Sequence, residues 1–194
     1  MSHAKNYFRK AKEIIEKIDL IKIGNLAKKL SKIRKNKGRI FFIGVGGSAG
    51  NCSHAVNDFR KLCEIECYSP ADNTSELTAR INDEGWETCY SDWLKISRLK
   101  NKDCLFIMSV GGGNIEKKVS VNIINSIKYA KKQKSKVFGI VGKKNGFTAK
   151  NSKDVIVVPE VDVKLVTPLT ESFQAVIWHC LVSDPKLQIK KTKW

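Results

Sequence analysis

The sequence has no run that approaches the roughly 20 consecutive apolar residues needed to span a bilayer. Its first residues, MSHAKNYFRKAKEIIEK, are charged where the core of a secretory signal peptide would be apolar. The two absences argue against a membrane-spanning or a secreted protein. We therefore expect a soluble, cytoplasmic protein that has no membrane partner.

A disulfide framework is also lacking. The six cysteines do not form the dense, regular pattern of small secreted domains, so we expect reduced thiols. Cys63 and Cys67 lie four residues apart, but no second cysteine or histidine pair follows at the spacing of a structural zinc site. Buried, small hydrophobic side chains are the simpler interpretation of these cysteines.

Acidic residues are few, with 19 Asp and Glu against 36 Lys and Arg, which gives a formal net charge of +17. A positive field of this kind attracts nucleic acids or anionic metabolites. The basic residues are scattered over residues 1–37, 117–136 and 186–193, without a recognisable nucleic-acid-binding motif. We predict lysine-rich, solvated faces and an anionic metabolite as partner, with no nucleic acid.

The 194 residues, 42% of them hydrophobic, suit one domain with a full core. Apolar runs predict strands within residues 39–44, 65–69, 103–110, 136–142 and 154–158. Helical spacing predicts two helices within residues 5–35, separated at Gly24, and others at residues 48–62, 116–133 and 168–183. Strands that alternate with helices predict an α/β fold, with a parallel sheet between two helical layers and two helices before it.

Two glycine-rich loops follow predicted strands, Gly44-Val45-Gly46-Gly47-Ser48 and Ser109-Val110-Gly111-Gly112-Gly113-Asn114. In open α/β sheets, ligands bind where such loops lead into helices, and bare backbone N–H groups can approach an oxyanion there. Ser48 adds a hydroxyl that could donate to a ligand or cap the helix. The loops match neither the dinucleotide fingerprint nor the Walker loop. A phosphorylated sugar is the predicted ligand, although tight turns also need glycine.

Two histidines are paired with carboxylates at helical spacing. His54 and Asp58 lie four residues apart, and Glu171 and His179 lie eight apart, a little over two helical turns. Two imidazoles and two carboxylates can hold a divalent metal of the zinc type or shuttle protons near neutral pH. The alternatives are an ordinary surface pair for the first two residues and a core position for His179.

Five motifs in this order, GVGGS, HAVND, NDEGW, Ser109 with its glycines, and ESFQAVIWH, resemble the sugar-isomerase (SIS) family over nearly the whole chain. The resemblance is to the bacterial phosphoheptose isomerases. It implies a single SIS domain over residues 1–194, with oligomerisation helices at 1–37 and a five-stranded αβα sandwich at 38–194. It also implies homotetramers, or dimers, with zinc-containing active sites between subunits.

The activity that the resemblance implies is the aldose–ketose isomerisation of sedoheptulose 7-phosphate to heptose 7-phosphate, through a cis-enediol, for lipopolysaccharide or capsule synthesis. The implied substrate-binding residues are Gly46, Gly47, Ser48, Asn82, Asp83, Ser109, Gly111 and Ser120. The implied metal ligands are His54, Asp58, Glu171 and His179. Of these, His179 or Glu171 would be the catalytic base, with Asp58 and His54 as its partner.

The sequence departs from the family's usual pattern at several of these positions. Val45 stands where the family has Asn, Asp58 where it has Glu, and Glu171 where it has Gln. Several extra residues precede Ser120, and the added negative charge favours a metal. We expect specificity to differ at Val45 and at the second loop, which leaves open an isomerase of another phosphosugar or a non-catalytic sugar-phosphate sensor.

Overall fold

Five short strands form one parallel sheet in the computed structural model, which describes residues 2–192. The strands lie in the order β2-β1-β3-β4-β5, and every neighbouring pair is parallel. They are β1 (Ile40–Ile43), β2 (Cys67–Tyr68), β3 (Cys104–Ser109), β4 (Lys136–Val141) and β5 (Val155–Val157). The structure confirms all five predicted strands.

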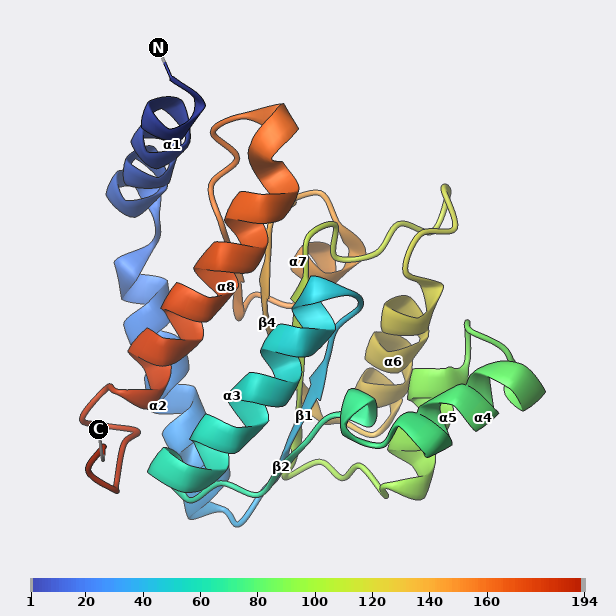
Figure 1. Ribbon diagram of the computed structural model, residues 1–194. Coiled ribbons are helices and arrows are strands. Elements are labelled where there is room, and N and C mark those ends of the chain that lie inside the picture. Colours follow the sequence, from blue (N-terminus) through green and yellow to red (C-terminus); the bar gives the residue numbers. More distant parts are fainter. Residues whose placement is uncertain (1, 193–194) are drawn as a thin grey trace.

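Helices cover both faces of this sheet (Figure 1). One face carries α2, α3 and α8, and the other carries α5 and α6, while α1 continues outward from α2. The helices are α1 (His3–Lys17), α2 (Leu20–Lys35), α3 (Gly47–Cys63), α4 (Thr74–Glu84), α5 (Cys89–Ile96), α6 (Val121–Lys132), α7 (Phe147–Asn151) and α8 (Val166–Val182). Short 3-10 turns lie at Pro70–Asp72 and Val163–Leu165. The predicted αβα sandwich is therefore confirmed.

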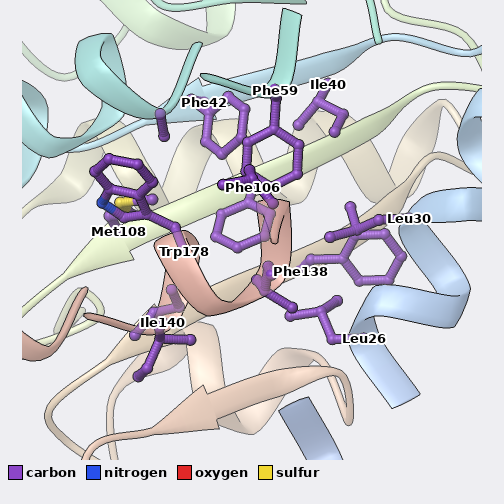
Figure 2. Packing of buried hydrophobic residues seen from close by; sticks show 14 of the residues in the cluster. Leu26, Leu30, Ile40, Phe42, Phe59, Phe106, Met108, Phe138, Ile140 and Trp178 are labelled. Carbon is purple, nitrogen blue, oxygen red and sulfur yellow. The ribbon is translucent and has the colours of Figure 1, made fainter. Parts of the chain in front are cut away.

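Alternate residues of each strand belong to two separate hydrophobic clusters, as the pleat of a sheet requires. Phe42 and Phe106 pack with the helices of one face, while Phe41 and Ile107 pack with those of the other. Figure 2 shows the first cluster, in which phenylalanines from β1, β3, β4 and α3 gather between the sheet and its helices, with Leu26 and Leu30 of α2 beside Phe138. The N-terminal helix α2 is therefore part of the core of the domain.

The sequence predicted the break between the first two helices at Gly24, but the structure places it between Lys17 and Leu20. The first helix ends at Lys17, the next residue Ile18 is extended, and the Asp19 carboxylate then accepts a hydrogen bond from the Lys22 N–H at 2.8 Å. An aspartate in this position caps and starts a helix. Gly24 lies inside α2, so the capping residue, and not the glycine, marks the boundary.

Other helix boundaries also differ from the prediction. α4, α5 and α7 were not predicted, and α6 begins at Val121 instead of Glu116. The residues before α6 form a small hairpin, because Asn114 and Val119 exchange backbone hydrogen bonds of 2.9 and 3.0 Å. α8 begins at Val166, so Pro168 lies in its first turn as expected.

The six cysteines are free thiols, as predicted. Cys52, Cys63, Cys67, Cys89 and Cys104 are buried, and Cys180 is exposed. Within residues 2–192, the structure contains no helix with the length and apolar character of a membrane span.

Replacing Gly24 or Gly38 by alanine should change the free energy of unfolding in opposite directions. Gly24 has open space around its Cα, so Gly24→Ala should stabilise the protein by about 0.5–1 kcal/mol through helix propensity. At Gly38, a Cβ would lie 2.1 Å from the Lys102 carbonyl oxygen, so Gly38→Ala should destabilise it by about 1–3 kcal/mol. Urea unfolding measures both changes, and equal signs would contradict this account.

Candidate functional site

The first glycine loop connects β1 to α3 and is fixed from the other face of the sheet. The buried Tyr90 hydroxyl donates a hydrogen bond to the Gly44 carbonyl at 2.8 Å. Gly46 has φ 62° and ψ −130°, a conformation that requires glycine, and α3 begins at the next residue. Ser48 is thus inside the helix and does not cap it, contrary to one expectation. Its buried hydroxyl has no hydrogen-bond partner among residues 2–192.

A carboxylate lies against this loop. A Cβ built on Gly47 would be 2.6 Å from the Glu171 Oε2 atom, so the glutamate of α8 reaches the first residue of α3. The amino end of a helix favours negative charge, and Glu171 supplies that charge here. A phosphate at the same place would be repelled by the carboxylate. The first loop therefore suits the uncharged part of a sugar better than its phosphate.

Two helices bring His54, Asp58 and His179 together. The Asp58 Oδ2 atom lies 3.8 Å from the His54 Nε2 atom and 3.7 Å from the His179 Nε2 atom. One donor atom from each residue lies within 4.8 Å of the others. Asp58 is buried, whereas the side chains of His54 and His179 are 60% and 48% exposed. The group has a buried carboxylate behind two imidazoles that face solvent.

Two further residues hold this group in place. The Asn57 amide donates to the Asp58 Oδ1 atom at 2.9 Å, which leaves Oδ2 to face the imidazoles. The indole of Trp178 lies with its ring centroid 4.7 Å from that of His54 and 3.5 Å from that of His179. Trp178 is fully buried and belongs to the core shown in Figure 2. The imidazoles therefore rest on a core side chain.

Sequence reasoning missed the roles of Asn57 and Trp178. Asn57 could have been noticed as an amide next to a predicted ligand. Trp178 carries no such signal, because an aromatic residue on an apolar helix is usually only a core residue.

The register between α3 and α8 is set by polar contacts. The Asn51 side-chain amide of α3 donates to the Glu171 carbonyl and to the Gln174 Oε1 atom of α8, both at 2.9 Å. Gln174 is fully buried, so a slip between the helices would leave its amide oxygen unpaired at a cost of about 1–3 kcal/mol. These contacts keep His179 opposite Asp58.

Three of the four predicted metal ligands form this group, and Glu171 lies outside it. Two imidazole nitrogens and one carboxylate oxygen are a donor set that zinc accepts, with a fourth position open as in catalytic zinc sites. Zinc bonds of 2.0–2.1 Å place tetrahedral donors about 3.3 Å apart. The observed separations of 3.7 and 3.8 Å need only small side-chain movements to reach that value. The residues fit zinc.

The second glycine loop follows β3 and is held by α7. The Ser109 hydroxyl accepts a hydrogen bond from the Gly112 N–H at 3.0 Å, and Gly112 and Gly113 have φ of 70° and 85°. The Thr148 hydroxyl and N–H both donate to the Gly112 carbonyl, at 2.7 and 2.8 Å. The Gly113 carbonyl accepts from the Phe147 N–H at 2.9 Å. The loop is thus an ordered part of the structure.

Ser120 lies between this loop and α6. It precedes the first helical residue, has φ 52°, and its hydroxyl makes no capping hydrogen bond within the described part of the chain. The extra residues of the loop form the hairpin at 114–119, which projects beyond the sheet in Figure 1. A pocket of about 280 Å³ lies against the hairpin, next to Gly113 and Lys150. The amino end of α6 therefore has the Ser120 hydroxyl beside it and suits an anion, whereas the wall of the pocket contains both Glu116 and Lys150.

The predicted substrate residues Asn82 and Asp83 lie elsewhere. They are exposed in the last turn of α4, where the Asn82 amide donates to the Asp83 Oδ1 atom at 2.7 Å. Leu77 and Ile81 of the same helix pack into the cluster on the face opposite α3 and α8. A single chain therefore does not bring Asn82 and Asp83 to the histidines.

Comparison with known proteins identifies relatives of the chain. Residues 6–142 match the family model described as SIS domain. Phosphoheptose isomerase 1 of Campylobacter jejuni is 31% identical over 158 residues, which cover 78% of each protein. The lincomycin biosynthesis protein LmbN of Streptomyces lincolnensis is 29% identical over 150 residues. That match spans 71% of this chain but only 52% of LmbN, so the chain corresponds to about half of that relative.

Solved structures share the fold. The phosphoheptose isomerase GmhA of Neisseria gonorrhoeae superposes with a TM-score of 0.79 at 24% identity, over 92% of this chain and 94% of that protein.

Cys180, next to His179, should be the reactive thiol. Burial raises the pKa of Cys63 to about 12 and that of Cys89 to about 11, and it raises those of Cys67 and Cys104 well above the usual value. A raised pKa lowers the fraction of thiolate, which is the nucleophile. We expect iodoacetamide at about pH 8 to add once to the folded protein, as measured by intact-mass spectrometry.

The control for this labelling is Cys180→Ser, which should abolish the adduct while the other five cysteines stay unmodified. Denatured protein should react at all six cysteines. A second rapid adduct on the folded wild-type protein would contradict the assignment.

Proposed function

The chain belongs to the SIS domain family, and on this basis we propose that it is an aldose–ketose isomerase of phosphorylated sugars. The observation that carries the proposal is the cluster of His54, Asp58 and His179 beside a helix that begins at a glycine loop. The similarity to phosphoheptose isomerases supports sedoheptulose 7-phosphate as substrate and heptose 7-phosphate as product. Lipopolysaccharide or capsule synthesis is the proposed destination of that product.

In this proposal the two glycine loops hold different parts of the substrate. The phosphate binds at Ser109, Gly111 and Ser120, because α6 begins there with no acidic residue in its first turn. The sugar end lies at Gly46, Gly47 and Ser48, next to the Glu171 carboxylate. The unpaired Ser48 hydroxyl would gain a hydrogen-bond partner from a sugar oxygen.

The chemistry we propose is proton transfer between adjacent carbons. A base removes a proton from the carbon next to the carbonyl, and the former carbonyl oxygen takes up a proton to give a cis-enediol. The hydroxyl on the adjacent carbon then loses its proton to become the new carbonyl, and a proton is delivered to the former carbonyl carbon. Glu171 is the proposed base, since it faces the first loop and stands outside the histidine group. If the group works without a metal, His179 is the alternative base, because Asp58 stabilises the imidazolium that forms.

Zinc held by His54, Asp58 and His179 would polarise the carbonyl and stabilise the enediolate. Two other residues of the chain would hold these ligands in place. Asn57 orients the Asp58 carboxylate, and Trp178 supports both imidazoles.

Turnover of a panel of hexulose and heptulose phosphates, with products identified by NMR, tests the activity. We expect turnover of sedoheptulose 7-phosphate, and a loss of at least about 100-fold in Asp58→Ala, His179→Ala and Glu171→Gln. His3→Ala is the matched control, because His3 is the one other histidine in the sequence and lies on α1. It should turn over like the wild-type protein.

The alternative functions are outcomes of the same experiment. Loss of activity on chelation and its return with zinc would support the metal, whereas full activity in chelator would favour His179 as base. If the protein turned over only another phosphosugar, that sugar would replace sedoheptulose 7-phosphate as the proposed substrate. Tight binding of a sugar phosphate without any turnover would contradict the proposed isomerase activity and would indicate a non-catalytic sugar-phosphate sensor.

We also propose that the active site is completed by a second copy of the chain, in a homotetramer or homodimer. α4, which carries Asn82 and Asp83, has no buried residue, and in α1 only Ile14 is buried. Large apolar side chains are exposed on the first two helices, at Phe8, Ile15, Leu20 and Ile21. These surfaces support an assembly through the N-terminal helices that covers the exposed histidines. The six free cysteines support a cytoplasmic location.

Complementation tests the shared site. Asn82→Ala and Asp58→Ala should each be inactive alone, and heteromers of the two should regain activity where one chain supplies Asn82 and the other Asp58. The two variants are co-expressed with different tags, purified through both tags and assayed. Heteromers that form but stay inactive would contradict a site built from two copies.

A further inference from the structure

A second polar pocket lies at the opposite edge of the sheet, at the amino ends of β1 and β3. Its volume is about 270 Å³. Five of its seven lining residues are cationic, namely Lys37, Arg39, Arg98, Lys100 and Lys102, and one residue, Glu66, is acidic. The glycine loops follow the carboxyl ends of the same strands, so this pocket is separate from the proposed reaction site.

The frame of the pocket is rigid. The Arg39 guanidinium donates to the Ser97 and Arg98 carbonyls at 3.0 and 2.8 Å and forms a 2.8 Å ion pair with Asp103. Asp103 is fully buried and also accepts from the Lys100 N–H at 2.9 Å. The hydrogen bond to Asp103 raises the pKa of Arg39, which stays cationic. Arg39 and Asp103 therefore neutralise each other and fix the loop that carries the remaining cations.

The other four cations of the pocket have no acidic partner. Lys37, Arg98, Lys100 and Lys102 form no ion pair with any residue in the range 2–192. Glu66 is the one carboxylate that faces them, and it accepts a hydrogen bond from the Tyr68 hydroxyl at 3.0 Å. Unpaired charges of one sign in a concave site raise the local concentration of counter-ions.

Two of these four cations occupy left-handed backbone positions. Lys37 and Arg98 follow the carboxyl ends of α2 and α5 with φ of 52° and 53°, where glycine is the usual residue. The last turn of α2 already contains three basic residues, at Lys32, Arg34 and Lys35, that interact with its dipole. Two bulky cations thus occupy left-handed backbone conformations on the rim of the same pocket, as Glu64, Lys118, Ser120 and Lys134 do elsewhere in the chain.

We propose that this pocket binds a small anion with two or more phosphate groups. Lysine and arginine side chains supply point charges and planar donor pairs for phosphate oxygens. The volume lies below the roughly 300–1,000 Å³ of pockets that enclose a drug-sized ligand, so the pocket suits a short phosphate chain better than a larger ligand. That chain is either free polyphosphate or the tail of a nucleotide. The site does not depend on the proposed isomerase activity.

Calorimetric titration of the full-length protein with sodium tripolyphosphate, near physiological ionic strength, tests the proposal. Lys100→Ala/Lys102→Ala should weaken binding at least about tenfold. The double variant Lys12→Ala/Lys17→Ala on α1 removes the same charge far from the pocket and should bind within about twofold of the wild-type protein. Equal weakening in both variants, or no binding to the wild-type protein, would overturn the proposal.

Arg98→Gly separates binding from folding. It removes a charge and relieves the left-handed backbone, so it should raise the melting temperature while it weakens tripolyphosphate binding. Unchanged binding in this variant would count against the pocket.

ATP bound as tightly as tripolyphosphate identifies a nucleotide tail as an equal source of the ligand, and weaker ATP binding identifies free polyphosphate. Tighter binding of an RNA oligonucleotide through Lys100 and Lys102 would replace the small anion with a nucleic acid.

Discussion

The packing of α3 against α8 is the interaction on which the candidate active site depends. Neither helix carries the site alone, because His54 and Asp58 come from one and His179 from the other. The Asn51 side chain of α3 donates to the Glu171 carbonyl and to the Gln174 side chain of α8, both at 2.9 Å, and Trp178 fills the space beneath both imidazoles. The same contact that closes one face of the core therefore sets the distances among the reacting groups.

Because of this dependence, the stability of the core affects the position of Asp58 more than the positions of the two histidines. Asp58 is buried and held by Asn57, so its position follows the core, whereas the two histidines are about half exposed. Enediol chemistry benefits from a site that excludes water. A chain whose histidines face solvent, and whose proposed substrate residues on α4 are equally uncovered, is suited to complete its site by association.

The two glycine loops illustrate how a sequence motif acquires different meanings in three dimensions. Both follow strands and precede helices, and both predict an anion site on local grounds. Glu171 comes from a segment more than a hundred residues away and occupies the amino end of α3, while the second loop is tied to α7 through Thr148. The two loops differ in their suitability for an anion because a tertiary contact places the Glu171 carboxylate beside the first loop, and not because of their glycine content.

The sequence alone determined the five strands, their parallel arrangement, the αβα layers and the pairing of His54 with Asp58. Those features depend on short-range patterns, namely apolar runs, helical spacing and glycine after strands, which are visible along the chain. It misplaced the first helix boundary at Gly24 and left α4, α5 and α7 unassigned. For α4 the reason is that the helix has no buried residue to create a pattern. Only the tertiary structure decided that Asp58 meets His179, that Glu171 turns to Gly47, and that Asn82 stays on the far face. The physical reason is that side-chain partners across packed helices are set by the three-dimensional register of the whole core, which no local spacing contains.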